Sequence, residues 1–142
     1  MSLKEKRTNE IERLRKLADK AFGPQHGRYD FYDYLEGVWQ LYLKWKADKK
    51  LKTRSEQLAE FDKDKVKLRK NTHAIRAIID ASCGQGPDDK SEWTRALQYL
   101  ENNLAQVQEV GFRKFIEDNG GPYGCARHVA ERRKDKGKAK AA

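Results

Sequence analysis

The chain has 142 residues and a mass of 16.5 kDa, which suits one domain of ordinary size. Its 31 Lys and Arg residues against 22 Asp and Glu residues give a formal net charge of +9, and its mean hydropathy is −1.03. Without an apolar run near the ~18–20 residues of a membrane span, and with only two cysteines, it is expected to be neither a membrane protein nor a disulfide scaffold. We therefore expect an intracellular, cytoplasmic or nucleoid-associated, basic protein.

The N-terminal segment predicts an amphipathic helix. Ser2 and Glu5 have the spacing of a capping box, in which the two side chains satisfy free backbone N–H groups. Apolar residues then recur every three or four positions up to Ala21. Gly23-Pro24 ends the pattern, because glycine favours a helix C-terminus and proline cannot continue the helix.

Residues 31–45 predict the most apolar helix, with Asp30 as its N-cap. At roughly 100° per residue its apolar side chains span an arc of about 200°, wider than a surface helix needs. This helix is therefore expected either to be central in the core or to form a homodimer interface. The residues of the apolar pattern are Phe31, Tyr34, Leu35, Val38, Leu41, Tyr42 and Trp45, widened by Tyr32, Trp39 and Leu43.

The middle of the chain predicts two shorter helices. A capping box, Thr53-Arg54-Ser55-Glu56, predicts that one helix begins at Thr53, and Asn71 is expected to cap another that runs to about Ser82. Between them, residues 65–70 alternate basic and apolar side chains up to Leu68. An extended segment is favoured there, and a helix is the alternative.

The C-terminal half predicts further helices separated by glycines. After the break at 84–87, Asp89 is expected to cap a helix whose apolar stripe runs from Trp93 to Val107. Gly111 predicts a break before a short helix, and a last helix is expected over residues 122–134. The chain thus predicts an all-α, compact bundle of about six or seven helices: one domain over residues 1–135 and a basic flexible tail over 136–142.

The positive charge is concentrated in two segments. Residues 44–70 hold eleven basic and five acidic residues, and residues 127–142 hold seven and two, whereas residues 71–126 carry a net charge of −3. Such localised charge is typical of proteins that bind a polyanion. The residues expected to contact phosphates are Lys44, Lys46, Lys49, Lys50, Lys52, Arg54, Lys65, Lys67, Arg69, Lys70, Arg132, Arg133 and Lys134.

One local resemblance concerns DNA binding. Residues 119–130, with Gly120-Gly121 before Ala126-Arg127, resemble the first helix of the helix-turn-helix in factor-for-inversion-stimulation-like proteins. No turn glycine and no recognition helix follow Ala130. The resemblance therefore implies no reading of bases in the major groove.

The sequence predicts no enzyme. It has no nucleophile elbow, P-loop or dinucleotide fingerprint. Cys125 and His128 have a tolerable spacing for a metal, but no second pair of donors lies near Cys83 or His73. We expect no catalytic residue, no metal site and no cofactor.

Two functions fit these patterns. The first is a non-enzymatic accessory or architectural protein that binds DNA or RNA through backbone charge. The alternative is a protein-interaction module, such as a stoichiometric inhibitor, adaptor or subunit of a nucleoprotein complex, whose basic surface docks on an acidic protein. Neither involves a membrane, and a homodimer through residues 31–45 fits both.

Overall fold

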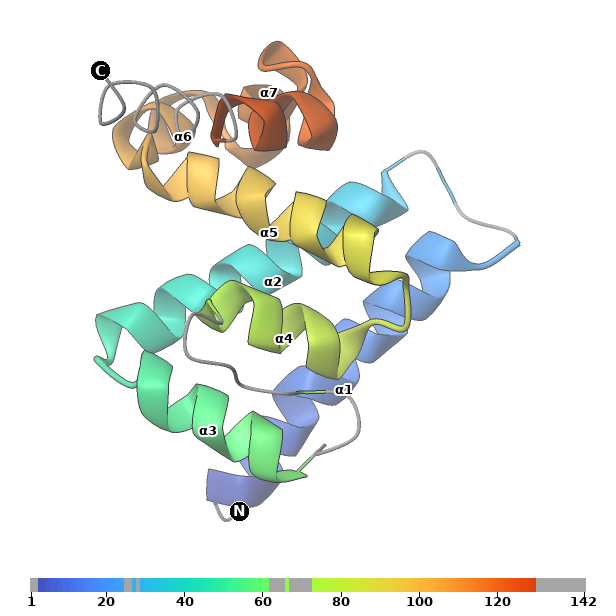
Figure 1. The fold of residues 1–142 in the computed structure, drawn as a ribbon, viewed down its shortest axis with the longest axis vertical. Coiled ribbons are helices and arrows are strands. Elements are labelled where there is room, and N and C mark those ends of the chain that lie inside the picture. Colours follow the sequence, from blue (N-terminus) through green and yellow to red (C-terminus); the bar gives the residue numbers. More distant parts are fainter. Residues whose placement is uncertain (1–2, 25–26, 28, 62–65, 67–72, 130–142) are drawn as a thin grey trace, which may run out of the picture. The chain divides into compact units, whose positions relative to one another are not determined.

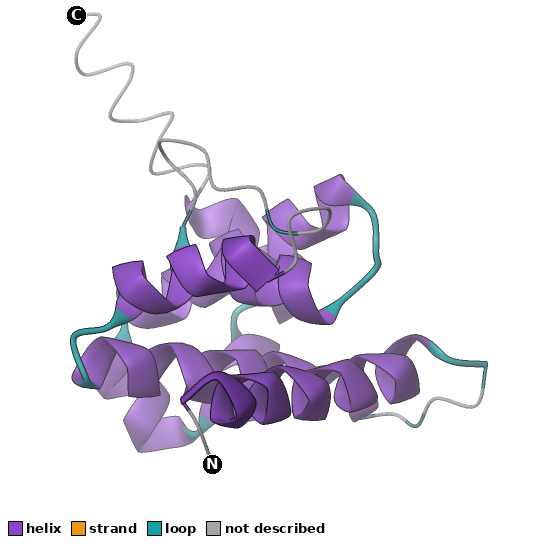
Figure 2. Ribbon diagram, turned by 90° about the horizontal axis from the view of Figure 1, so that it is seen from below, coloured by secondary structure: helices purple, strands orange, loops and turns teal. Residues whose placement is uncertain are grey.

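A computed structural model describes residues 3–24, 27, 29–61, 66 and 73–129, and within them every regular element is a helix (Figures 1 and 2). The prediction of an all-α protein is confirmed. The chain divides into two compact units, and the division falls between Gln85 and Gly86. A single domain over residues 1–135 with a basic tail stays a prediction.

The first unit contains four helices: α1 (Leu3–Phe22), α2 (Asp30–Ala47), α3 (Leu51–Phe61) and α4 (Ala74–Ser82). α1 and α2 form an antiparallel hairpin, and α2 also packs against α3 and α4 (Figure 1). The prediction that the wide apolar arc of α2 is central is thus confirmed within this unit. A homodimer through the same helix stays a prediction.

The core of the first unit joins α2 to α4. Tyr34, Leu35 and Val38 on α2 are completely buried, as are Ile75, Ile78 and Ile79 on α4. Burial of such side chains stabilises a fold by about 1.5–3 kcal/mol each. α4 has only nine residues, of which seven are buried, so it depends on this packing for its stability.

The start of α2 differs from the prediction. Asp30 is the first residue of the helix, and Tyr29 occupies the N-cap position without a side-chain cap. The buried Asp30 carboxylate instead accepts a hydrogen bond from the backbone N–H of Gly27 and lies 3.5 Å from the Lys20 ammonium group. Asp30 therefore closes the loop between α1 and α2.

The starts of α3 and α4 were also predicted incorrectly. α3 begins at Leu51, two residues before Thr53, because the turn that ends α2 leads directly into it. α4 begins at Ala74, and its cap is His73, whose Nδ1 accepts a hydrogen bond from the N–H of Ile75 at 3.1 Å. The predicted cap, Asn71, lies outside the described residues.

The second unit contains α5 (Pro87–Glu101), α6 (Leu104–Val110), α7 (Phe112–Asp118) and a further helical stretch over residues 121–129. α5 does not begin after a cap at Asp89, as predicted, but at Pro87. Proline suits the first position of a helix, because the backbone N–H that it lacks would have no partner within the helix there. The predicted stripe from Trp93 to Val107 is divided between two helices, since α5 ends before Asn102 and Asn103.

Glycines set the remaining boundaries of the second unit, as predicted. Gly111 has φ +97° and separates α6 from α7. Gly120 and Gly121 also have positive φ and follow α7. The last helical stretch buries Cys125, Ala126 and Val129, although its expected residues 130–134 lie outside the described part of the chain.

Candidate nucleic-acid interface

Six of the predicted phosphate-binding residues lie at the end of α2, at the start of α3 and in the turn that joins these helices. Asp48 is the C-cap of α2, and Lys49 follows it with φ +59°. The N–H of Lys50 donates to the carbonyl of Trp45, and the N–H of Lys49 donates to that of Lys46. This pair of hydrogen bonds is a Schellman motif, in which a left-handed residue reverses the chain. We call residues 46–52 the basic corner.

The left-handed position of the basic corner carries a lysine where glycine is usual. A side chain in this conformation costs roughly 1–2 kcal/mol, because its Cβ approaches the following carbonyl oxygen. The corner continues into α3 without a spacer, since the carbonyl of Lys50 accepts the N–H of Arg54 at 2.9 Å. Lys49 and Lys50 are therefore held in place by the backbone of both helices.

Most of the positive charge at the basic corner has no carboxylate partner. Lys46, Lys49, Lys50 and Lys52 are all exposed. Among the described residues, no ion pair involves Lys49, Lys50 or Lys52. The first turn of α3 also contains no acidic residue. The partly positive N-terminus of α3 and the partly negative C-terminus of α2 both lie in this corner and offset each other, so the lysines themselves supply its positive potential.

Lys44 lies apart from the basic corner. Its ammonium group forms an ion pair of 2.8 Å with Glu10 on α1. That carboxylate offsets the charge of Lys44, so Lys44 contributes less to the positive potential than the lysines beyond Asp48.

Arg54 differs from the lysines in its surroundings. Its guanidinium carbon lies 5.9 Å from the centre of the Trp45 ring, and its side chain is half-buried. Trp45 is only 1% exposed, which confirms that it is a core residue and excludes its ring as a platform for bases. The cation–π contact holds Arg54 beside the corner.

Seven predicted residues lie outside the described part of the chain: Lys65, Lys67, Arg69, Lys70, Arg132, Arg133 and Lys134. Val66 is described, and it is non-helical and buried. Whether the seven contact phosphates stays a prediction.

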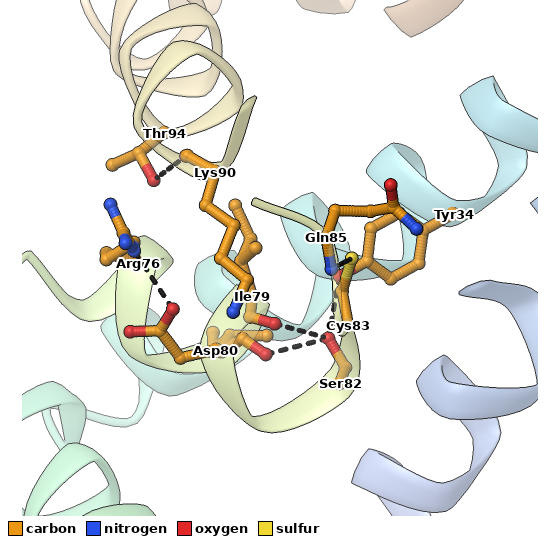
Figure 3. A network of polar contacts seen from close by, with 10 residues as sticks. Tyr34, Arg76, Ile79, Asp80, Ser82, Cys83, Gln85, Lys90 and Thr94 are labelled. Atoms are coloured by element: carbon orange, nitrogen blue, oxygen red, sulfur yellow. Dashed lines mark hydrogen bonds and ion pairs between the residues drawn. The ribbon is translucent and has the colours of Figure 1, made fainter. Parts of the chain in front are cut away.

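A second polar cluster lies at the end of α4 (Figure 3). The Tyr34 hydroxyl lies 2.7 Å from the Ser82 hydroxyl, which in turn donates to the carbonyl of Ile78 at 2.7 Å. Burial raises the pKa of Tyr34, so the phenol stays protonated. The Asp80 carboxylate accepts a hydrogen bond from Nε of Arg76, which lies four residues earlier on α4. These contacts satisfy buried polar groups, and the Tyr34–Ser82 contact ties α2 to the end of α4, which indicates a structural role.

The described residues contain no group of three or more His, Cys, Asp and Glu side chains arranged to hold a metal ion. None of the described helices is long and apolar enough to cross a membrane. Comparison with known proteins finds no matching family model, no matching curated protein and no matching solved structure.

One feature of the interface could not be found from the sequence. The lysine run at 49–52 predicts charge, but no residue type in it predicts a Schellman motif, which usually has glycine at the left-handed position. The turn follows instead from the packing of α2 and α3 on each other.

Proposed function

We propose that the protein is a non-enzymatic nucleic-acid-binding protein that contacts backbone phosphates through the basic corner. The observation that carries this proposal is the set of three exposed lysines, Lys49, Lys50 and Lys52, which have no ion pair among the described residues. They lie together in the turn between α2 and α3 and in the first turn of α3, which contains no acidic residue. An intracellular location, cytoplasmic or nucleoid-associated, is part of the proposal.

The chemistry of the corner fits phosphates better than bases. Lysine presents a compact charge that attracts a phosphate but reads no sequence. Trp45, Phe112 and Phe115, which are adjacent in sequence to basic residues, are buried and offer no surface on which a base could stack. We therefore expect binding with little sequence preference, as for an accessory or architectural protein.

A salt titration of binding tests the proposal. Each phosphate neutralised on duplex DNA contributes a slope of about −0.9 to the plot of log K against log salt. The double variant Lys50→Gln/Lys52→Gln should therefore reduce the slope by about 1.8. The matched control, Lys16→Gln/Lys114→Gln, removes two exposed lysines elsewhere and should leave the slope nearly unchanged.

The titration should use duplex DNA, single-stranded DNA and RNA, each with the full chain and with a chain that lacks residues 132–142. A slope near zero, or an equal loss in the control variant, would contradict the proposal. If an acidic protein is retained by the basic corner after nuclease digestion, the corner is a protein-docking surface instead.

A further inference from the structure

A groove runs between α1 and α2 on the first unit. Its volume is about 540 Å³, and its apolar floor includes Leu14, Leu17 and Leu41. Gly37 allows the two helices to approach closely here, because a Cβ at this position would lie 2.7 Å from Cδ2 of Leu14. At this point of the groove the leucine side chains of α1 therefore lie directly against the backbone of α2.

The charged groups of the groove are unequally paired. At one end Glu10 is bound to Lys44, as described above. Towards the start of α2, Asp33 and Glu36 lie one turn apart on the same helix, and both are exposed. Among the described residues neither carboxylate forms an ion pair, and Arg13 is the remaining charged group of the lining. The unpaired charge of the groove is therefore negative.

The two ends of α2 consequently have opposite charges. The groove presents Asp33 and Glu36 beside leucines, and the basic corner presents Lys50 and Lys52 on either side of Leu51. Leu51 is half-buried, so part of an apolar side chain is exposed at the same corner as these two lysines. An apolar surface flanked by carboxylates and one flanked by ammonium groups are complementary.

We propose that the basic corner of one copy of the protein docks in the α1–α2 groove of a second copy. The contact proposed is heterologous: only one corner and one groove are used in each pair of copies, so a free groove and a free corner remain at the two ends. Association then continues beyond a dimer. The proposal goes beyond nucleic-acid binding and does not depend on it, although phosphates would compete for the same lysines.

The first experiment measures the mass of nuclease-treated protein by sedimentation over a range of concentrations. The average mass should rise with concentration past that of a dimer. High salt should suppress this rise, because the screening length falls from about 10 Å at 0.1 M salt to about 3 Å at 1 M.

Charge reversal then tests the two surfaces. The variant Asp33→Lys/Glu36→Lys and the variant Lys50→Glu/Lys52→Glu should each be monomeric alone. An equimolar mixture of them should associate again, since every reversed corner finds a reversed groove. Far-ultraviolet circular dichroism checks that both variants are folded. The matched control is Glu109→Lys/Glu117→Lys, at two exposed positions of the second unit. It raises the net positive charge as much as the groove variant does, and it should still associate, weakened only by that added charge.

The outcomes separate this proposal from nucleic-acid binding. The groove variant should bind DNA or RNA as the unchanged protein does, whereas the corner variant should bind them more weakly. A protein that stays monomeric at every protein and salt concentration overturns the docking proposal. A basic segment of another protein would then be the candidate ligand of the groove. Association that survives reversal of Asp33 and Glu36, or a mixture that does not associate, also overturns it.

Discussion

Arg15 on α1 donates a hydrogen bond of 3.0 Å from its Nε to the backbone carbonyl of Ala81 on α4. The last carbonyls of a helix have no partner within the helix, so this guanidinium satisfies one of them from a distant part of the chain. The same guanidinium pairs with Glu12 one turn earlier on α1, which helps to orient it. The contact ties the end of the short α4 to the hairpin of α1 and α2.

Replacing Arg15 should weaken the first unit. Arg15→Met keeps most of the aliphatic stem but leaves the Ala81 carbonyl without this donor, and we expect a loss of about 1–2 kcal/mol in the free energy of unfolding. Urea denaturation measures it. The control Arg13→Met, at an exposed position on the same helix, should change stability by less than about 0.5 kcal/mol. Equal effects of the two variants would contradict the role given to Arg15.

Lys49→Gly should separate stability from binding. Glycine adopts the left-handed conformation freely, so the variant should be more stable by up to about 1 kcal/mol in thermal or urea unfolding. It also removes a cation from the basic corner, and nucleic-acid affinity should fall, with a salt slope smaller by about 0.9.

The control for this change is Lys16→Gly in the interior of α1. There the residue is already helical, and glycine should destabilise by about 1 kcal/mol. If Lys49→Gly is destabilising to the same extent, the backbone at residue 49 does not have the strain that its φ of +59° indicates.

Gly124 should not tolerate a side chain. A Cβ there would lie 2.2 Å from the backbone carbonyl oxygen of Asn119, which cannot move without shifting the turn after α7. We expect Gly124→Ala to destabilise by about 1–3 kcal/mol, in spite of the higher helix propensity of alanine. Thermal unfolding checks this. Gly84→Ala is the matched control, because nothing lies within 4 Å of its added Cβ, and it should be nearly neutral.

Stability should decline in alkaline solution. Burial raises the pKa of the Cys125 thiol from 9.0 to about 11. Between these values the unfolded chain has lost the proton and the folded chain keeps it, so the free energy of unfolding falls by up to about 1.4 kcal/mol per pH unit. Below pH 9 the thiol is protonated in both the folded and the unfolded chain, and the free energy of unfolding does not depend on its titration. Burial of Tyr34 raises its pKa as well, which adds to the decline above pH 10.

Urea unfolding at several pH values from 8 to 11 measures this decline. The variant Cys125→Ala should have a shallower dependence on pH over the same interval, whatever its stability at neutral pH. An unchanged slope in the variant would show that the thiol does not retain its proton in the folded chain.

Periodicity predicted the helices better than their first residues. The i, i+3, i+4 pattern identified the buried face of α2, because burial of one face is what the pattern records. It did not show the division at Asn102 and Asn103, since the stripe continues across it through Leu100 and Val107. Asn103 ends the helix locally: its side-chain amide donates to the carbonyl of Tyr99 at 2.8 Å.

Cap residues were misleading for a related reason. Thr53 and Asp89 are common N-cap residues, yet α3 and α5 had already begun at Leu51 and Pro87. The start of α3 is fixed by a turn that depends on tertiary packing, and rules based on neighbouring residues do not describe such packing. For α5 the signal was present in Pro87, which favours the first position of a helix. The lysines of the candidate interface were visible in the sequence, whereas their left-handed turn and the pairing of Lys44 with Glu10 required the fold.

The burial of both thiols has a practical consequence. The chain contains two cysteines, Cys83 and Cys125, and both are free and buried. A maleimide reacts with an accessible thiolate, so neither native residue should compete with a cysteine introduced at an exposed position such as Tyr123, which is 64% exposed. Fluorophores or spin labels can therefore be attached at chosen sites without first removing the native cysteines.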